Sequence, residues 1–265
     1  MKRSSGVRLC ATAAVSVLSL ALITGCSDGG SKDSGDAKDG KGSGSSSAAK
    51  ARTAAELDKL ILAQGEAAGY KVEPVDKAAP AKSAITADKE QCKPLLYVMS
   101  GHAPADAAAE TNRTVSENKK DPTDKATSMD DLADGKFEDT LKASMDLDVS
   151  LVSLSSYDGD GAEKALKSVS DAVKACAGGF TGGSGSDKEK FTKVTEEKSS
   201  GTGDASVAFA TTGDMDGDTA PVHAEVVRHG NTLAAYYTMN IGAMMAHKDY
   251  AVPAAVIKAQ AAKLK

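Results

Sequence analysis

The stretch that decides the expected fold is Val222-His-Ala-Glu-Val-Val-Arg-His-Gly-Asn-Thr-Leu-Ala-Ala-Tyr-Tyr-Thr-Met-Asn-Ile241. It holds two runs, residues 222–228 and 233–241, that are rich in β-branched and aromatic side chains, with His229-Gly-Asn231 between them. Two such runs joined by a few residues that include glycine are typical of a β-hairpin. The C-terminal half of the chain is therefore expected to contain an antiparallel sheet.

Further strands are expected around this hairpin. Met145, Leu147, Val149 and Leu151 alternate with polar residues, which predicts a half-buried strand. Weaker patterns predict other strands at residues 70–72, 109–115, 191–195 and 205–211. Two polar, glycine-containing segments, 118–136 and 178–187, are expected to be loops.

Four helices are expected between and after these strands. Thr53 and Glu56 form a capping box for a helix over residues 54–67. Thr86 is expected to cap a short helix that carries Cys92 and that Pro94 kinks or ends. Apolar residues at helical spacing predict two more, at 162–176 and 253–264. This order favours one α+β domain over residues 51–265, with a largely antiparallel sheet covered by helices.

Residues 1–25 have the composition of a signal peptide. Lys2, Arg3 and Arg8 precede an apolar run over residues 9–23, and there is no acidic residue. A transmembrane helix needs roughly 20 apolar residues, so this run is too short for one and fits an export signal.

The end of that run, Leu22-Ile-Thr-Gly-Cys26, resembles the lipobox of bacterial lipoproteins. The resemblance implies that Cys26 is acylated and becomes the first residue of the mature chain; ordinary secretory cleavage beside a chance cysteine is the alternative. Membrane lipid would then be a partner, through the Cys26 anchor, and the protein would lie on the outer face of the cytoplasmic membrane. Residues 26–50 are polar and form the expected flexible tether, with a reach of roughly 25 to 30 Å.

The charge balance excludes one class of partner. The chain has 32 Lys and Arg against 37 Asp and Glu, and the first 25 residues hold three of the basic ones, which leaves 29 minus 37, or −8. An acidic chain lacks the electrostatic footprint of a nucleic-acid-binding protein.

The cysteines allow one pairing. Cys10 would leave with the signal and Cys26 would be acylated, so Cys92 and Cys176 remain. In an oxidising compartment they are expected to form one disulfide, worth about 4.5 kcal/mol in the chain-entropy model. Two buried free thiols are the alternative.

The layout as a whole resembles a known group of domains. A lipobox and a polar tether precede a first helix ending at Gly69-Tyr70. Cys92 follows, then Cys176 on the helix before a strand-rich half, and an amphipathic helix comes last. This resembles the actinobacterial extracytoplasmic sensor-type domains, similar to the outer domain of the PknH kinase and to lipoproteins with a PsbP-like fold. The resemblance implies a sheet with helices on its faces and a ligand-binding cleft, with no catalytic residues to carry over. The kinase domain has two disulfides, whereas this chain can form one.

Two acidic segments echo calcium loops. Asp214-Met-Asp216-Gly-Asp218 has carboxylates two apart, but Thr219 stands where a calcium loop needs glycine, so an acidic hairpin turn is favoured. Asp158 and Asp160 have the same two interpretations, with an N-cap role for Asp160 favoured.

Histidine and carboxylate side chains on the first hairpin strand form a possible metal set. His223, Glu225 and His229 share one face, but six residues of strand put the two histidines about 20 Å apart, beyond the reach of one zinc ion. They are therefore expected to be solvent-facing sheet residues, and no metal or cofactor is expected.

The second hairpin strand and the residues after it hold the densest group of adaptable apolar side chains. Tyr236, Tyr237, Met239, Met244 and Met245 could line an apolar, ligand-binding cleft, or they could pack in the core.

These observations favour a non-enzymatic, membrane-anchored binding or sensor-type module. Its partner would be a small molecule, an envelope component or another protein. One alternative is an envelope enzyme whose site assembles from His102, His223 and an aspartate. Another is a lipid carrier with a large apolar cavity.

Overall fold

The computed structural model describes residues 49–75, 79–119, 144–215 and 218–265. The predicted signal peptide, Cys26 and nearly all of the predicted tether lie outside the described residues. Most of the loop predicted at 118–136 and the residues Asp216 and Gly217 do so as well.

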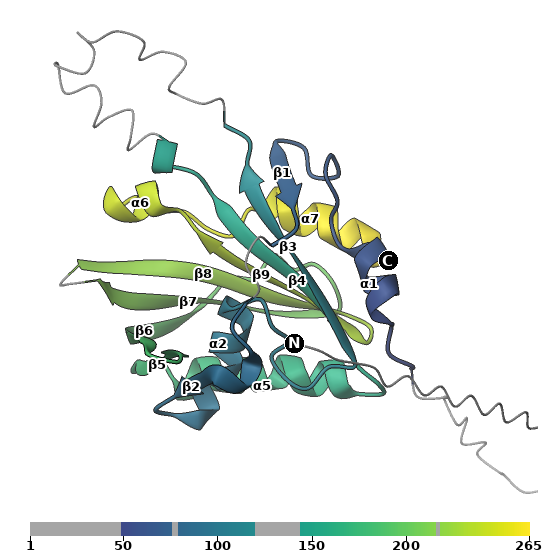
Figure 1. Ribbon diagram of the computed structural model, residues 1–265, viewed down its shortest axis with the longest axis horizontal. Coiled ribbons are helices and arrows are strands. Elements are labelled where there is room, and N and C mark those ends of the chain that lie inside the picture. The colour runs from purple at the N-terminus through teal and green to yellow at the C-terminus, as the bar shows by residue number, and fades with distance from the viewer. Residues whose placement is uncertain (1–48, 76–78, 120–143, 216–217) are drawn as a thin grey trace, which may run out of the picture. The chain divides into compact units, whose positions relative to one another are not determined.

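The described chain is built on one antiparallel sheet of nine strands, in the order β1-β3-β4-β9-β8-β7-β6-β5-β2 (Figure 1). The hairpin at 222–241 is confirmed: β8 and β9 pair from His223↔Thr238 to His229↔Thr232, with Gly230 and Asn231 in the turn. The strands are β1 Tyr70–Glu73, β2 Ile85–Ala87, β3 Ala109–Glu117, β4 Val149–Ser156, β5 Phe180–Ser184, β6 Asp187–Glu197, β7 Ala205–Met215, β8 Asp218–His229 and β9 Thr232–Met239.

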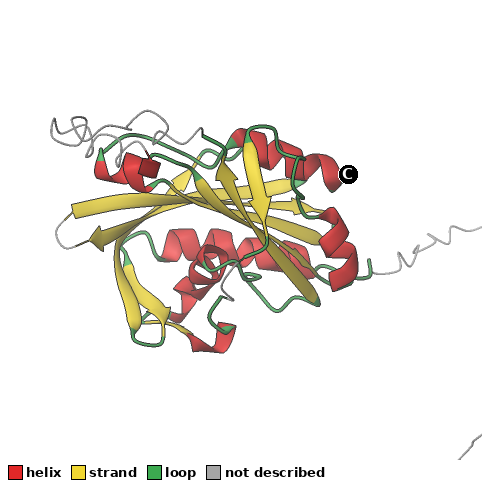
Figure 2. Cartoon of the chain, turned by 45° about the horizontal axis from the view of Figure 1, so that its top comes forward, coloured by secondary structure: helices red, strands yellow, loops and turns green. Residues whose placement is uncertain are grey.

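Helices pack on both faces of this sheet (Figure 2). On one face α2 and α5 bury a cluster that includes Leu95, Val169, Phe209 and Leu233; on the other, α1 and α7 bury Leu57, Ile61, Tyr236 and Val256. The cover is partial, because most side chains of β6 are exposed. The helices are α1 Ala54–Leu60, α2 Lys93–Met99, α5 Gly161–Ala175, α6 Ile241–Met245 and α7 Ala254–Lys263, with single 3-10 turns at Lys82–Ala84 and Glu90–Cys92.

The first helix ends earlier than predicted. The capping box of Thr53 and Glu56 is present, but α1 stops at Leu60 because Ile61 has extended backbone angles. The Leu62 N–H then donates to the Gln260 side chain of α7 at 2.9 Å. A contact with the end of the chain therefore outcompetes the local helical pattern.

The helix expected from Thr86 is also corrected. Thr86 lies in β2, and Pro94 stands in the first turn of α2, so it helps to begin the helix and does not end it. Proline fits there because the first turn needs no N–H donor and its fixed φ suits a helix.

One strand prediction and one loop prediction are corrected. The strand expected at 145–151 is β4, which begins at Val149 and runs to Ser156, and its polar Ser150 is buried because β4 lies between β3 and β9. Most of the loop expected at 178–187 is the β5–β6 hairpin. The last hairpin strand ends at Met239, and Asn240 caps α6 by accepting a hydrogen bond from the Ala243 N–H at 2.8 Å.

The disulfide between Cys92 and Cys176 is confirmed. The two Cα atoms are 6.0 Å apart, and both residues are fully buried. The bond joins the start of α2 to the C-terminal end of α5 on one face of the sheet.

Candidate functional site

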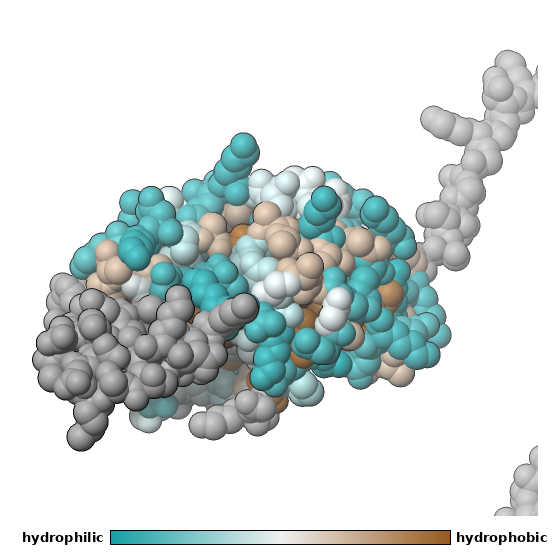
Figure 3. Space-filling view, turned by 90° about the horizontal axis from the view of Figure 1, so that it is seen from above, coloured by the Kyte–Doolittle hydropathy of each residue, from teal (hydrophilic) through white to brown (hydrophobic). Residues whose placement is uncertain are grey.

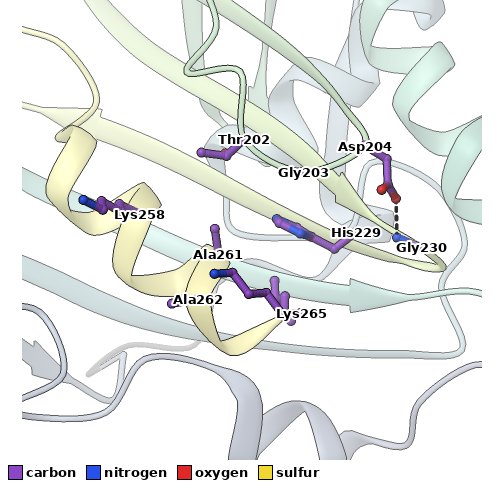
Figure 4. Close-up of a pocket in the computed structure, with 10 residues that line it drawn as sticks. Thr202, Gly203, Asp204, His229, Gly230, Lys258, Ala261, Ala262 and Lys265 are labelled. Atoms are coloured by element: carbon purple, nitrogen blue, oxygen red, sulfur yellow. Dashed lines mark hydrogen bonds between the residues drawn. The ribbon is translucent and has the colours of Figure 1, made fainter.

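A pocket of about 620 Å³ lies between α7, the β8–β9 turn and the segment that leads into β7 (Figure 4). These three segments are far apart in the sequence, and the antiparallel order of β7, β8 and β9 brings them to the same edge of the fold. The lining residues are Thr202, Gly203, Asp204, His229, Gly230, Lys258, Ala261, Ala262, Leu264 and Lys265.

One wall is the outer face of α7. Lys258, Ala261 and Ala262 of α7 line the pocket, and Lys265 follows just after the helix ends at Lys263. Val256, Ile257 and Gln260 of the same helix are buried against α1 and the sheet. The small alanines leave room between the two lysines. The helix is thus held by one face and lines the pocket with the other.

The opposite wall depends on a close approach that only glycine permits. Gly203 has a φ of +70°, and a Cβ there would lie 2.4 Å from the Arg228 carbonyl oxygen. Asp204 then accepts a hydrogen bond from the Gly230 N–H at 2.6 Å and lies 3.4 Å from the Arg228 guanidinium. These contacts fix the segment before β7 against the β8–β9 turn.

His229 stands between the two walls. Its Nε2 atom is buried and has no hydrogen-bond partner among the described residues. Burial lowers the pKa of His229 below its ordinary value of about 6.5; nearby Asp204 opposes this and nearby Arg52 adds to it. The ring is therefore neutral at pH 7.

This environment predicts a pH effect on stability. The unfolded chain binds a proton at His229 more readily than the folded chain does, so the stabilisation is complete above about pH 6.5 and is lost as the pH falls through the lower folded pKa. We expect the unfolding free energy of the wild type to fall more steeply from pH 7.5 to 5 than that of His229→Asn. Denaturant titrations would measure both, with exposed His247→Asn as the control. Parallel curves for the wild type and His229→Asn would contradict the expectation.

The turn that lines the pocket also holds the first described residues. Asn231 donates its side-chain N–H to the Lys50 carbonyl oxygen at 2.6 Å, and the Arg52 guanidinium donates to the Thr232 hydroxyl at 3.3 Å. On the loop after β4, Asp158 accepts a hydrogen bond from the Ala51 N–H at 2.9 Å. We call residues 49–52 and these partners the tether clamp.

A second pocket, of about 460 Å³, is lined by Lys82, Ser83, Tyr97, Ala105 and Asp106. The Lys82 ammonium donates to the Ala105 carbonyl oxygen at 2.7 Å and lies 4.7 Å from the centre of the Tyr97 ring. Burial lowers the pKa of Lys82, while Glu110 and Asp106 oppose this. The Lys82 ammonium of this second pocket is therefore already bound by groups of the protein itself.

The expected solvent-facing position of His223 and Glu225 is wrong. His223 is 9% exposed and lies 3.0 Å from the Glu197 carboxylate, with the Tyr250 ring edge-on against it. Glu225 is 4% exposed and accepts hydrogen bonds from the N–H and hydroxyl of Ser200. The sheet continues beyond β8 to β7 and β6, and the segment after β6 folds over this face. In the described parts of the chain no three His, Cys, Asp or Glu side chains are grouped to hold a metal.

The five residues that could line an apolar cleft or pack in the core do not line one cavity. Tyr236 belongs to the cluster under α1 and α7, whereas Tyr237 packs against the cluster under α2 and α5. Adjacent strand residues point to opposite faces, so both rings cannot line one cavity. Burial raises the pKa of both tyrosines. Met239 and Met244 are half-buried, and Met245 is 57% exposed on α6.

The other predicted residues lie apart from the first pocket. His102 contacts the Pro80 carbonyl oxygen at 2.8 Å and Glu110 at 3.3 Å, so it and His223 have separate partners. Asp160 occupies the N-cap position of α5 as expected, but its side chain pairs with Lys164 at 2.9 Å and makes no capping hydrogen bond. Asp214 lies in β7 and Asp218 begins β8, so the acidic segment joins two paired strands.

Sequence reasoning missed the residues of the first pocket. The available signal was a pair of lysines seven residues apart with alanines between them, one on the exposed face of the last helix and one just after its end. That pattern alone describes any solvated helix face. The partners Gly203 and His229 come from other segments, so the pocket emerges only from the fold.

None of the helices in the described parts of the chain is long and apolar enough to span a membrane. No protein-family model matches the chain, and no curated protein matches it. Among solved structures, the chain is similar to the extracellular domain of PknH from Mycobacterium tuberculosis, with 12% sequence identity, a TM-score of 0.46, and coverage of 81% of this chain and 95% of that chain.

Proposed function

We propose that the protein is a membrane-anchored extracytoplasmic lipoprotein whose folded part acts as a non-enzymatic, ligand-binding or sensor-type module. The observation that carries the proposal is the pocket between α7 and the β8–β9 turn. Its volume of about 620 Å³ falls in the range of small-molecule sites, and its lining combines apolar surface with a few polar groups.

Two features support an extracytoplasmic, anchored protein. The buried Cys92–Cys176 disulfide suits an oxidising compartment. The stretch Leu22 to Cys26 resembles a lipobox, and a diacylglyceryl cysteine binds membranes far more strongly than one acyl chain.

The tether clamp supports a sensor-type role. His229 and Gly230 line the pocket, and the next two residues, Asn231 and Thr232, hold residues 50 and 52. A ligand in the pocket therefore touches the same four-residue turn that fixes the end of the tether. A shift of this turn on ligand binding would therefore act directly on residues 50 and 52, at the end of the tether.

Replacing Cys26 tests the anchor. We expect Cys26→Ala to move the exported full-length protein from the membrane fraction to the soluble fraction, because no acyl group can be added at that position. Cys10→Ala is the matched control and should stay with the membrane, since Cys10 lies in the signal peptide. Fractionation and mass spectrometry of the mature N-terminus would measure both. Membrane retention of Cys26→Ala equal to that of the wild type would contradict the anchor.

A further inference from the structure

We infer that the pocket between α7 and the β8–β9 turn binds a small anionic ligand, a phosphate or carboxylate group attached to a short apolar body, through Lys258 and Lys265. The inference rests on the proposed function and names the ligand class of the same pocket. Four observations carry it: the unpaired lysines, their spacing, the engaged acid beside them and the apolar lining.

The two pocket lysines have no charge partner. Among the residues that the structure describes, no hydrogen bond or ion pair involves the side chain of Lys258 or Lys265. Lys263, on the same helix, faces α1, donates to the Ile61 carbonyl oxygen at 2.8 Å and pairs with Glu66. The lysine at the packing interface is therefore neutralised by Glu66, whereas Lys258 and Lys265 have no such partner among the described residues.

The spacing of the pair suits one shared anion. Lys258 lies in α7, and Lys265 lies two residues beyond the end of that helix at Lys263. Both side chains are long and flexible, so they can turn toward one group between them. Figure 4 shows Ala261 and Ala262 between the two lysines, with His229 across from this face. An anionic group above the alanines can therefore be contacted from both ends of the pocket.

The acid that lines the pocket does not cancel this charge. Asp204 turns its carboxylate to the Gly230 N–H at 2.6 Å and to Arg228 at 3.4 Å. The side chains that line the pocket therefore include two unengaged positive charges, in a chain whose formal net charge is −5. A concave site of one charge sign concentrates ligands of the opposite sign.

The rest of the lining fits an apolar body beside the anionic group. Ala261, Ala262 and the largely buried Leu264 present aliphatic surface, and the His229 ring adds a flat side. Figure 3 shows one face of the molecule, on which hydrophilic residues surround an area of apolar ones. A simple ion would leave most of the pocket's volume unfilled.

Calorimetric titration of the full chain in detergent tests the inference. The probes are phenyl phosphate, its neutral analogue phenol, its cationic analogue phenethylamine, and inorganic phosphate. We expect phenyl phosphate to bind most tightly, with affinity falling as salt rises. Lys258→Gln and Lys265→Gln should each weaken binding about fivefold, as an exposed ion pair would. Lys174→Gln is the matched control and should change nothing, because Lys174 is an exposed lysine of α5 with no ion pair to another described residue.

Vesicles distinguish the source of the anion. If the ligand is a lipid headgroup, phosphatidylglycerol vesicles should bind more tightly than phosphatidylcholine vesicles, with the same dependence on Lys258 and Lys265. If the ligand is free, phenyl phosphate binding should show that dependence and the vesicles should not. Either result supports an anionic ligand.

Ala262→Phe fills the pocket and separates the two ways in which the idea can fail. If phenol or phenethylamine binds the wild type but not Ala262→Phe while no anion binds, the ligand class is wrong and the binding function stands. If phenyl phosphate binds to Lys258→Gln and to Lys265→Gln as tightly as it binds to the wild type, the assigned residues are wrong. If no probe of any charge binds, both the ligand class and the proposed binding function fail.

Discussion

Replacing Cys92 and Cys176 together with alanine is expected to lower the free energy of unfolding by about 4 to 5 kcal/mol. The bond links residues 84 apart in sequence, so its loss returns a large amount of conformational freedom to the unfolded chain. Alanine is preferable to serine because both positions are fully buried and serine would bury two hydroxyl groups. The denaturant slope m should also rise, since an unfolded chain without the cross-link exposes more surface.

The reduced wild type is the control for this prediction. It keeps both sulfur atoms and their packing between α2 and α5, so it separates the cross-link from the side-chain change. Urea unfolding of the oxidised wild type, the reduced wild type and the double variant gives the three free energies. A reduced wild type within 1 kcal/mol of the oxidised protein would show that the chain-entropy account does not apply to this bond.

The parts of the fold that the sequence predicts are those with local signals. The hairpin at 222–241 has two strand-forming runs around a glycine turn, and α5 has its apolar residues at helical spacing. The disulfide follows from counting cysteines once Cys10 and Cys26 are assigned elsewhere. Each of these needs no knowledge of a distant segment.

The parts that fail depend on contacts across the chain. Ser150 looks like a solvent-facing residue, but its hydroxyl pairs with Thr238 at 2.8 Å inside the sheet. The pocket joins residues 202–204, 229–230 and 258–265, and no local pattern reports that convergence. Tyr236 and Tyr237 pack in the core, which is one of the two interpretations of the sequence, and they lie on opposite faces of the sheet because neighbouring strand residues alternate.

Gln260 of α7 is the strongest case of a contact between distant segments, because its side chain bonds to the backbone at the end of α1. Replacing Gln260 with methionine is expected to lower the free energy of unfolding by about 2 to 4 kcal/mol. Its fully buried amide accepts from the Leu62 N–H at 2.9 Å and donates to the Leu60 carbonyl oxygen at 2.9 Å. Methionine keeps a similar volume but leaves both backbone groups without that partner. A buried polar group that loses its partner costs about 1 to 3 kcal/mol.

The matched control is Gln91→Met, which changes the same side chain at an exposed position and should alter stability by less than about 0.5 kcal/mol. Hydrogen exchange at the Leu62 amide provides a local reading, because this N–H is protected by the Gln260 side chain and not by α1, which ends at Leu60. Gln260→Met should speed that exchange more than exchange in the β8–β9 hairpin. Equal stability of Gln260→Met and Gln91→Met, with the Leu62 amide still protected from hydrogen exchange, would contradict the prediction. The end of α1 would then be held by the apolar packing of Ile61 and Leu62, without a contribution from the Gln260 amide.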